Sequence, residues 1–201
     1  MKPVQLTFDV KNPDWLIWKS QIVMSRGEEP YFSELFKKLA FLQPTTVLEV
    51  GFGLGISAEL IQQHLRPISH DIVELDVGIF QDLQTFALGK QGVQPILGDW
   101  NTFKAKKQYD FIFFDTYDYF PPNCSVEVAR VQRAKRARQL LTSNGVFCHP
   151  HFGDGDIPDL PGFDTVVVER LQVPEFSVAD GSKCEYVAIV YHRQNLLENF
   201  G

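Results

Sequence analysis

The sequence predicts an α/β fold in which helices cover both faces of a mainly parallel β-sheet. Short β-branched and aromatic runs alternate with helical stretches from residue 46 to residue 150, which is typical of strands joined by helical crossovers. Near the end of the chain, "FDTVVVERLQV" and "EYVAIVYHR" follow each other without a helix between them. They predict an antiparallel pair at one sheet edge. The length of 201 residues, without a repeat or a flexible linker, is enough for a single domain with a sizeable core.

The N-terminal part, from about residue 12 to 43, is interpreted as helical. Its apolar residues are grouped on two faces, the first with Trp15, Leu16, Trp18, Ile22 and Val23 and the second with Tyr31, Leu35, Leu39 and Leu42. Pro30 suits the first turn of the second helix, where its missing N–H costs nothing.

The remaining elements follow in order along the chain. The predicted strands are "TVLEV" at 46–50, "HDIVEL" at 70–75, "VQPIL" at 93–97, "YDFIFFD" at 109–115 and "GVFCHP" at 145–150. Predicted helices run to about residue 65, to about residue 89, and over the basic stretch 125–141. The charges of that last helix are interpreted as a solvated face.

The charge balance and the cysteines narrow the classes of function. A net charge of -6 gives no basic surface for phosphates, so no nucleic-acid partner is expected. Cys124, Cys148 and Cys184 are odd in number and far apart, which argues against a disulfide framework and a zinc finger. The first residues lack the apolar core of a signal peptide, and no stretch is long enough to span a bilayer. We therefore expect a cytoplasmic protein without a membrane partner.

A glycine-rich turn, "VLEVGFGLG", follows the first strand of the predicted sheet. In open α/β sheets ligands bind beyond the carboxyl ends of the strands, where such a turn approaches them backbone to backbone. The spacing of Gly51, Gly53 and Gly55 is G-x-G-x-G, and Glu49 stands two residues before the first glycine. This departs from the dinucleotide pattern G-x-G-x-x-G, and a glycine turn alone is a weak signal.

Acidic residues end the next two predicted strands. Glu74 can accept hydrogen bonds from both ribose hydroxyls of an adenosine, and Asp99 lies beside the same crevice, where Trp100 can cover the base. Each acid alone could be a helix cap or turn residue. Together at three successive strand ends, the turn, Glu74 and Asp99 favour a nucleoside ligand.

The arrangement from Glu49 through Glu74 to Asp99 resembles the class I S-adenosylmethionine-dependent methyltransferases. The resemblance implies a Rossmann-like, seven-stranded sheet whose last two strands form the antiparallel edge. It also implies S-adenosyl-L-methionine as cofactor and S-adenosyl-L-homocysteine as product. The expected cofactor-binding residues are Met24, Glu49, Gly51, Phe52, Gly53, Gly55, Glu74, Leu75, Asp99 and Trp100.

Four stretches resemble the guanidinoacetate N-methyltransferase family, namely "VMSRGEEPY", "VLEVGFG", "FFDTYD" and "KCEYVAIVYHR". The resemblance extends over about residues 20–192 and implies a helical lid and substrate segment over 1–44 and a cofactor-binding sheet core over 45–201. It assigns Glu28 and Asp115 to the guanidinium of the acceptor and adds Tyr117 as a hydroxyl contact.

The chemistry of a guanidinium agrees with two carboxylates. The group is planar and donates paired N–H bonds, so carboxylates in its plane orient it through bidentate, charge-assisted hydrogen bonds. Methylation of a guanidinium requires the removal of a proton, and Asp115 is the predicted base. Without the resemblance, Glu28 and Glu29 would be interpreted as favourable charges at a helix start, and Asp115 as a turn residue.

The stretch 148–163 departs from the family pattern, which leaves the far end of the acceptor open. His149 and His151 are predicted to bind substrate there, where they could meet a carboxylate. Asp154 and Asp156 instead favour an acceptor that carries an amine, such as agmatine, arginine or an arginine-containing peptide. A His-x-His pair with an aspartate can also hold a metal, but this spacing is unspecific, and a solvated loop is a further alternative. Since methyl transfer from a sulfonium requires no metal, none is expected.

Two other functions remain open from the sequence. An aminopropyltransferase of the spermidine synthase type shares the sheet, the glycine turn and acids that bind an amine, but the long N-terminal β-region expected for it is missing from the pattern. A non-catalytic S-adenosylmethionine-binding protein is the second alternative, although it would have no need of a proton acceptor such as Asp115.

Overall fold

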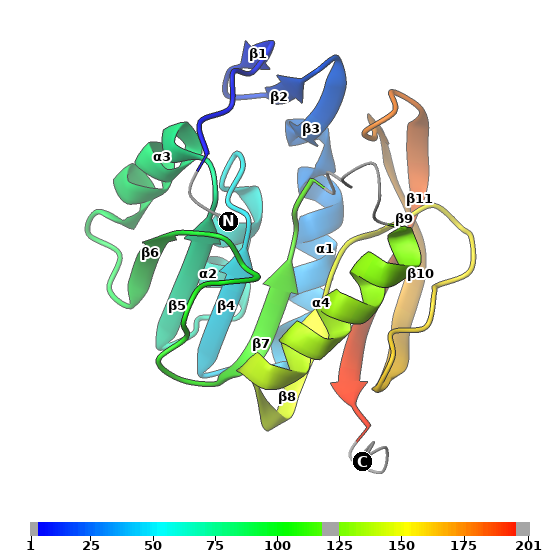
Figure 1. Ribbon diagram of the computed structural model, residues 1–201. Helices are drawn as coiled ribbons and strands as arrows, with labels where there is room; N and C mark the ends of the chain where they lie inside the picture. Colours follow the sequence, from blue (N-terminus) through cyan, green and yellow to red (C-terminus); the bar gives the residue numbers. More distant parts are fainter. Residues whose placement is uncertain (1–3, 118–124, 196–201) are drawn as a thin grey trace.

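The computed structural model describes residues 4–117 and 125–195, and its centre is a twisted sheet with the strand order β10-β11-β8-β7-β4-β5-β6 (Figure 1). The strands are β4 (Thr46–Val50), β5 (Ser69–Glu74), β6 (Val93–Leu97), β7 (Tyr109–Phe114), β8 (Leu141–Cys148), β10 (Phe163–Ser177) and β11 (Lys183–Gln194). A short strand, β9 (His151–Phe152), pairs with β11 beside this path. The predicted α/β fold with a seven-stranded sheet is confirmed.

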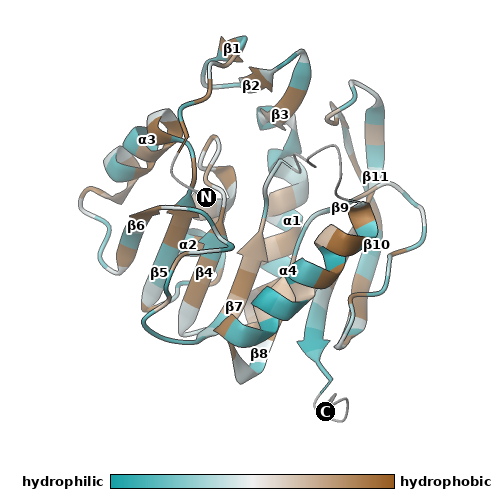
Figure 2. Ribbon diagram, in the orientation of Figure 1, coloured by the Kyte–Doolittle hydropathy of each residue, from teal (hydrophilic) through white to brown (hydrophobic). Residues whose placement is uncertain are grey.

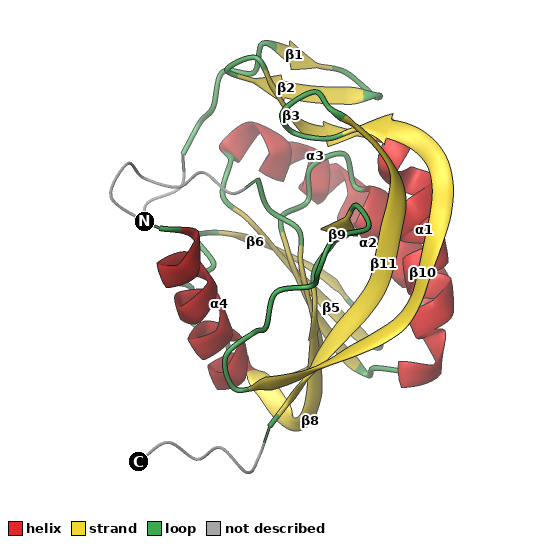
Figure 3. Cartoon of the chain, turned by 90° about the vertical axis from the view of Figure 1, so that its right-hand side faces the viewer, coloured by secondary structure: helices red, strands yellow, loops and turns green. Residues whose placement is uncertain are grey.

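The direction of the strands also agrees with the prediction. Strands β6, β5, β4, β7 and β8 pair in parallel, whereas β11 is antiparallel to both of its neighbours, β8 and β10. The two long terminal strands form a curved hairpin at the sheet edge (Figure 3). The sheet therefore has the antiparallel terminal pair that the consecutive apolar runs predicted.

Helices cover both faces of this sheet. Figure 3 shows α1 (Glu29–Leu39), α2 (Ile56–His64) and α3 (Val77–Ala87) on one face and α4 (Val126–Leu140) on the other. Alternation along β7 supplies both cores, because Phe111 and Phe113 pack on the α1 side while Ile112 and Phe114 pack on the α4 side. Figure 2 accordingly shows β7 as mostly hydrophobic between more polar outer elements. Among the described residues, no helix combines the length and apolar character needed to cross a bilayer.

The N-terminal part differs from the prediction. The prediction of a helix from about residue 12 is wrong up to residue 25. This part of the chain instead forms an antiparallel sheet of β1 (Val10–Lys11), β2 (Trp15–Trp18) and β3 (Gln21–Ser25). Lys19 and Ser20 have φ values of 50° and 61° and join β2 to β3 in a two-residue turn. Positive φ at both turn residues matches the twist of a β-hairpin. Helical structure begins only at the 3-10 turn η1 (Arg26–Glu28), continues in α1 with Pro30 in its first turn, and ends in the 3-10 turn η2 (Ala40–Leu42).

The N-terminal sheet lies above the carboxyl ends of the central strands (Figure 1). Val4 pairs with Asp76 just beyond β5, and the Ile22 amide donates to the Ala179 carbonyl at the far end of the β10–β11 hairpin (3.2 Å). These contacts hold the segment over the end of the sheet where the predicted site residues lie. Its role as a lid stays a prediction.

Candidate active site

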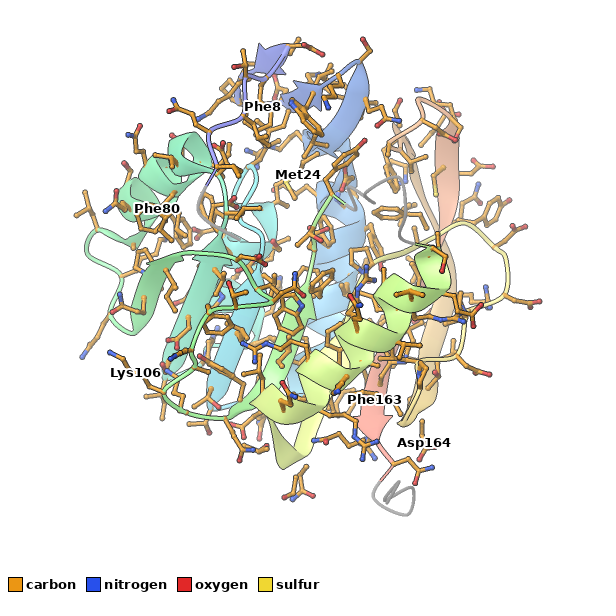
Figure 4. All side chains as sticks on the ribbon, viewed as in Figure 1. Phe8, Met24, Phe80, Lys106, Phe163 and Asp164 are labelled. Atoms are coloured by element: carbon orange, nitrogen blue, oxygen red, sulfur yellow. The ribbon has the colours of Figure 1, made fainter. Side chains whose placement is uncertain are left out.

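The glycine turn between β4 and α2 is packed so closely that two of its glycines have no room for a side chain. A Cβ on Gly51, whose φ is 91°, would lie 2.1 Å from the Asp115 carbonyl oxygen. A Cβ on Gly53, whose φ is 54°, would lie 2.5 Å from the Met24 sulfur, which also accepts a hydrogen bond from the Leu54 amide (3.1 Å). Figure 4 shows Met24 between the N-terminal strands and the central sheet. The turn thus contacts both β3 and the end of β7. Positive φ at all three glycines, including 74° at Gly55, explains their presence.

Glu74, the last residue of β5, joins the glycine turn to the start of α3. Its Oε2 accepts from the Phe52 amide (2.9 Å) and its Oε1 from the Asp76 amide (2.8 Å). Burial is the main reason that the pKa of Glu74 is raised. Each carboxylate oxygen has a further lone pair, so the side chain can still accept from a ligand hydroxyl. Asp76 instead caps α3 by accepting from the Ile79 amide (2.8 Å).

Glu49 lies beneath the turn and is fully buried. Its Oε2 is 2.9 Å from Nε2 of His70, which is fully buried as well, and its Oε1 accepts a short hydrogen bond from the Ser57 hydroxyl. Gln62 contacts the other ring nitrogen of His70 (3.0 Å). These contacts fix the end of β4 to α2 and β5. A direct contact of Glu49 with the cofactor stays a prediction.

The three other predicted cofactor residues at the β5 and β6 ends are close to the N-terminal segment or the α4-side core. The Leu75 carbonyl accepts from the Val4 amide (3.1 Å). Asp99 accepts from the amide and the side chain of Asn101 (2.9 and 3.0 Å). Trp100 packs edge-on against Phe114, with ring centroids 5.4 Å apart. Their contacts with a nucleoside stay predictions.

Two buried carboxyl groups, Glu28 and Asp115, face the same region next to the glycine turn. Burial, and then the charge of Asp115, raises the pKa of Glu28 to about 8, although a hydrogen bond from the Ser25 backbone opposes this. Burial, and then the charge of Glu49, raises the pKa of Asp115 to about 7. Asp115 as a residue is partly exposed, but its Oδ2 is buried and has no hydrogen-bond partner in the described part of the chain. Such an arrangement is completed by a cation that donates hydrogen bonds.

Local sequence holds Glu28 in this position. Its Oε1 accepts from the Ser25 amide (2.8 Å), while the Ser25 hydroxyl accepts from the Gly27 amide (3.0 Å), which is a capping box around η1. The alternative for Glu28 as a helix-start charge is therefore partly right, because one of its oxygens has a capping role. A contact of the other oxygen with an acceptor stays a prediction. Glu29 is exposed in the first turn of α1, 3.5 Å from Arg26, as expected of a cap.

Tyr117 and the histidines have contacts that the sequence did not predict. The Tyr117 hydroxyl donates to the side chain of Gln21, and its ring lies 6.1 Å from that of Trp18, so this residue joins the end of β7 to the N-terminal sheet. His149 and His151 lie together with His192 of β11, and neither forms a hydrogen bond or ion pair with Glu28 or Asp115 among the described residues. Substrate contacts of Tyr117, His149 and His151 stay predictions.

Sequence reasoning missed three side chains of this region. His70 is the second residue of β5 and Ser57 lies in the first turn of α2, and neither is marked by a motif. Tyr31 was interpreted only as core, but its hydroxyl accepts from the His151 amide (3.0 Å) and donates to the Ala188 carbonyl (3.2 Å). A tyrosine hydroxyl in a buried apolar stripe was the only available signal, since it requires a partner.

The sheet order, the glycine turn and the carboxylates at the carboxyl ends of β4, β5 and β7 define the class I methyltransferase fold. Solved structures agree with this class. N-methyltransferase NodS from Bradyrhizobium japonicum WM9 is similar with a TM-score of 0.62 at 12% identity, over 84% of this chain and 97% of that chain. Its complex with S-adenosyl-l-homocysteine gives 0.60 at 15% identity, over 84% and 88%. Spermidine synthase from Thermotoga maritima gives 0.61 at 13% identity, over 90% of this chain and 65% of that chain.

A family model gives the more particular assignment. Residues 5–154 match the model of guanidinoacetate N-methyltransferase. The chain therefore belongs to the guanidinoacetate N-methyltransferase family, a family of S-adenosylmethionine-dependent methyltransferases.

Proposed function

We propose that this protein transfers a methyl group from S-adenosyl-L-methionine to a guanidino nitrogen of a small cationic acceptor or of an arginine-containing peptide. The observation that carries the proposal is the pair Glu28 and Asp115, two buried carboxyl groups of raised pKa, one with an unpartnered oxygen. A guanidinium supplies both the positive charge and the parallel N–H donors that such a pair lacks.

The residues beyond β4, β5 and β6 fit the cofactor. The glycine turn carries no side chains at Gly51, Gly53 and Gly55, which suits a close approach of a ligand to its backbone, and Glu74 keeps lone pairs for ribose hydroxyls at the end of β5. Phe52 and Gly55 belong to this turn, Met24 contacts it, and Leu75 follows Glu74. Asp99 and Trp100 are assigned to the adenine end. When bound, the cofactor supplies an electrophilic methyl group on a sulfonium.

Glu28 and Asp115 have different roles in this proposal. Glu28, whose Oε1 is fixed by the Ser25 amide, orients the guanidinium through its other oxygen. The unpartnered Asp115 Oδ2 takes one proton from the reacting nitrogen as the new carbon–nitrogen bond forms. The product remains a guanidinium, because the acceptor loses one proton while it gains the methyl group. Alignment of the nitrogen with the transferred methyl supplies further acceleration.

The experiment is a mass-spectrometric assay with S-adenosylmethionine and a panel of guanidinoacetate, arginine, agmatine, an arginine peptide and simple amines. Asp115→Asn should lose most turnover but keep its cofactor affinity. Asp110→Asn is the matched control, because Asp110 lies near the start of β7, whereas Asp115 follows its end. Asp110 accepts from the Thr45 and Thr46 amides at the opposite end of the sheet (3.1 and 3.0 Å). Near-normal turnover in Asp115→Asn would exclude it as the base.

Glu28→Gln tests the second carboxyl group. The glutamine amide oxygen can still accept from the Ser25 amide, so the capping box is kept while the charge is lost. We expect a higher KM for the guanidine with a smaller change in kcat. A kcat effect without a change in KM would contradict the assignment of Glu28 to acceptor binding.

The aminopropyltransferase alternative has one observation in its favour. The N-terminal region that was interpreted as helical contains the short sheet β1–β3, so the argument from a missing β-region is weakened. The same assay with decarboxylated S-adenosylmethionine distinguishes the two, because only an aminopropyltransferase requires that donor. Cofactor binding without product from any acceptor would favour a non-catalytic binding protein.

A further inference from the structure

Two histidines that are close in the sequence and a third that is distant form a cluster on the α4 side of the sheet. His149 follows β8, His151 is in β9 and His192 is in β11, and their candidate ligand nitrogens all lie within 4.8 Å of one another. The ring centroids are 4.3 Å apart for His149 and His151, 5.2 Å for His149 and His192, and 6.0 Å for His151 and His192.

The register of the sheet explains why these rings meet. Phe147 pairs with His192 and His151 pairs with Ala188, so the chain from β8 to β9 runs along β11. Side chains two residues apart in an extended chain point to the same face, so those at 147, 149 and 151 share one face of the sheet. Their cross-strand partners share that face as well. His149 and His192 are therefore neighbours of Phe147, with ring centroids 5.8 and 6.2 Å from it.

The cluster is separate from the candidate active site. Cys148 points to the opposite face, where it joins the α1-side core, and Asp115 contributes with burial to raising the pKa of its thiol. His149 points to the α4 side, because successive residues of a strand face opposite ways. One connection remains, since the Tyr31 hydroxyl of α1 accepts from the His151 amide (3.0 Å).

The hydrogen bonds of the cluster leave nitrogens available for coordination. Nδ1 of His149 is 3.2 Å from the Pro150 carbonyl, which can only accept, so Nδ1 carries the proton and Nε2 has a lone pair. Nδ1 of His192 is 3.1 Å from the Thr165 hydroxyl. Nε2 of His151 and Nε2 of His192 are buried without a hydrogen-bond partner among the described residues. His149 and His192 thus resemble metal-binding histidines, in which a neighbour holds one ring nitrogen and the other binds the metal.

The three imidazoles are shielded from solvent to different degrees, since His192 is fully buried and His149 and His151 are partly buried. Neutral imidazoles bind borderline divalent ions such as Zn²⁺.

We propose that His149, His151 and His192 form a binding site for one divalent first-row transition-metal ion, with Zn²⁺ as its probe. Three points within 4.8 Å of one another always have a centre no more than about 2.8 Å from each, compared with ~2.0–2.1 Å for a Zn–N bond. Ring movements of less than about 1 Å complete the site. The ion ties the β8–β9 segment to β11, and the fourth coordination position is left to water or an anion.

The cluster changes the expectation of no metal that was drawn from the sequence. His149 and His151 alone had an unspecific spacing, and an aspartate was the expected third ligand. The third ligand is instead His192, which β-sheet pairing brings in from 41 residues beyond His151 along the chain. The site is proposed as structural and does not depend on the acceptor that the protein methylates.

Metal binding to the full chain tests this proposal. The chelator-treated protein should take up one equivalent of Zn²⁺ in calorimetry, with a rise in Tm, and Co²⁺ should give the visible absorption of a low-coordinate nitrogen site. His151→Gln and His149→Gln should each weaken Zn²⁺ affinity by about tenfold or more. His64→Gln is the matched control, because His64 lies in α2 outside the cluster and should leave affinity unchanged.

The proposal is overturned if the wild-type chain takes up no stoichiometric Zn²⁺, or if His151→Gln and His149→Gln bind it as tightly as His64→Gln. His192 is fully buried, so its replacement risks the fold. The wild-type measurement and the two less buried variants keep the test decisive without it.

Discussion

The contact between Gly51 and Asp115 gives the sharpest test of how the glycine turn and the proposed base are coupled. In Gly51→Ala the new Cβ would lie 2.1 Å from the Asp115 carbonyl oxygen, whereas ordinary van der Waals contact begins at about 3.5 Å. The end of β7 must therefore move by more than about 1 Å. Because the obstacle is backbone, no side-chain rotation relieves it.

The loss of stability expected in Gly51→Ala has two parts. Gly51 has a φ of 91°, and alanine at positive φ costs about 1–2 kcal/mol in the free energy of unfolding. Gly89 has a φ of 75°, and a Cβ added there would meet nothing within 4 Å, so Gly89→Ala shows this part alone. The overlap in Gly51→Ala adds about 1–3 kcal/mol. Each kcal/mol lowers Tm by about 2–4 °C in a chain of this size.

The assay compares both variants with the wild type by urea denaturation and by calorimetric titration with S-adenosylmethionine. Gly51→Ala should lose more stability than Gly89→Ala and should also bind the cofactor more weakly, because the turn and the end of β7 both move. Equal losses of stability in the two variants, with wild-type cofactor affinity in Gly51→Ala, would refute the reasoning.

Three further predictions concern other parts of the molecule. Glu49→Gln breaks the fully buried contact with His70 and should cost about 3 kcal/mol in the free energy of unfolding. The control Glu59→Gln removes an exposed pair with Lys90 and should cost less than about 1 kcal/mol. Equal costs would contradict the role given to the buried pair. Replacing Lys19 and Ser20 together by Asn and Gly should raise the free energy of unfolding by about 1 kcal/mol, because both positions have positive φ. A lower free energy of unfolding in urea denaturation would contradict the hairpin. Asp115→Asn should stabilise the protein at high pH only. The pKa of Asp115 in the folded protein is about 7, above its ordinary value of 3.8, so the wild type loses stability as the pH rises from about 4 to about 7. Stability curves of the variant and wild type should coincide near pH 4 and separate by pH 8, and a constant difference would contradict the raised pKa.

Most of the sheet could be predicted because its signals are local. The runs at 46–50 and 93–97 coincide with β4 and β6, and the others deviate by a few residues at their ends. The N-terminal hairpin could not be predicted in the same way. Its turn is Lys-Ser instead of Asn-Gly, and its apolar residues fit a helical period as well as two short strands. Pairing with the rest of the molecule decides between the two.

The candidate site was predictable where a residue's role follows from its place at a strand end. Glu74 is of this kind, because the carboxyl ends of parallel strands meet at one edge. Asp115 also follows a strand end, but its assignment to the acceptor came from the family resemblance. The pairing of Glu49 with His70 and the approach of His192 to His149 depend on register between strands. No spacing along the chain carries that information, so these contacts required the structure.

The proposed reaction also explains why the acid pair is built from groups that resist ionisation. A guanidinium beside a sulfonium places two positive charges close together, and at ~4 Å their repulsion is about 4 kcal/mol for an effective dielectric constant of 20. Glu28 and Asp115 offset this repulsion once both are ionised, and their raised pKa values mean that a bound cation is what favours ionisation. As the sulfonium charge disappears during methyl transfer, the proton affinity of Asp115 rises again. The carboxylate thus becomes the stronger base at the moment when the methylated nitrogen has to lose its proton.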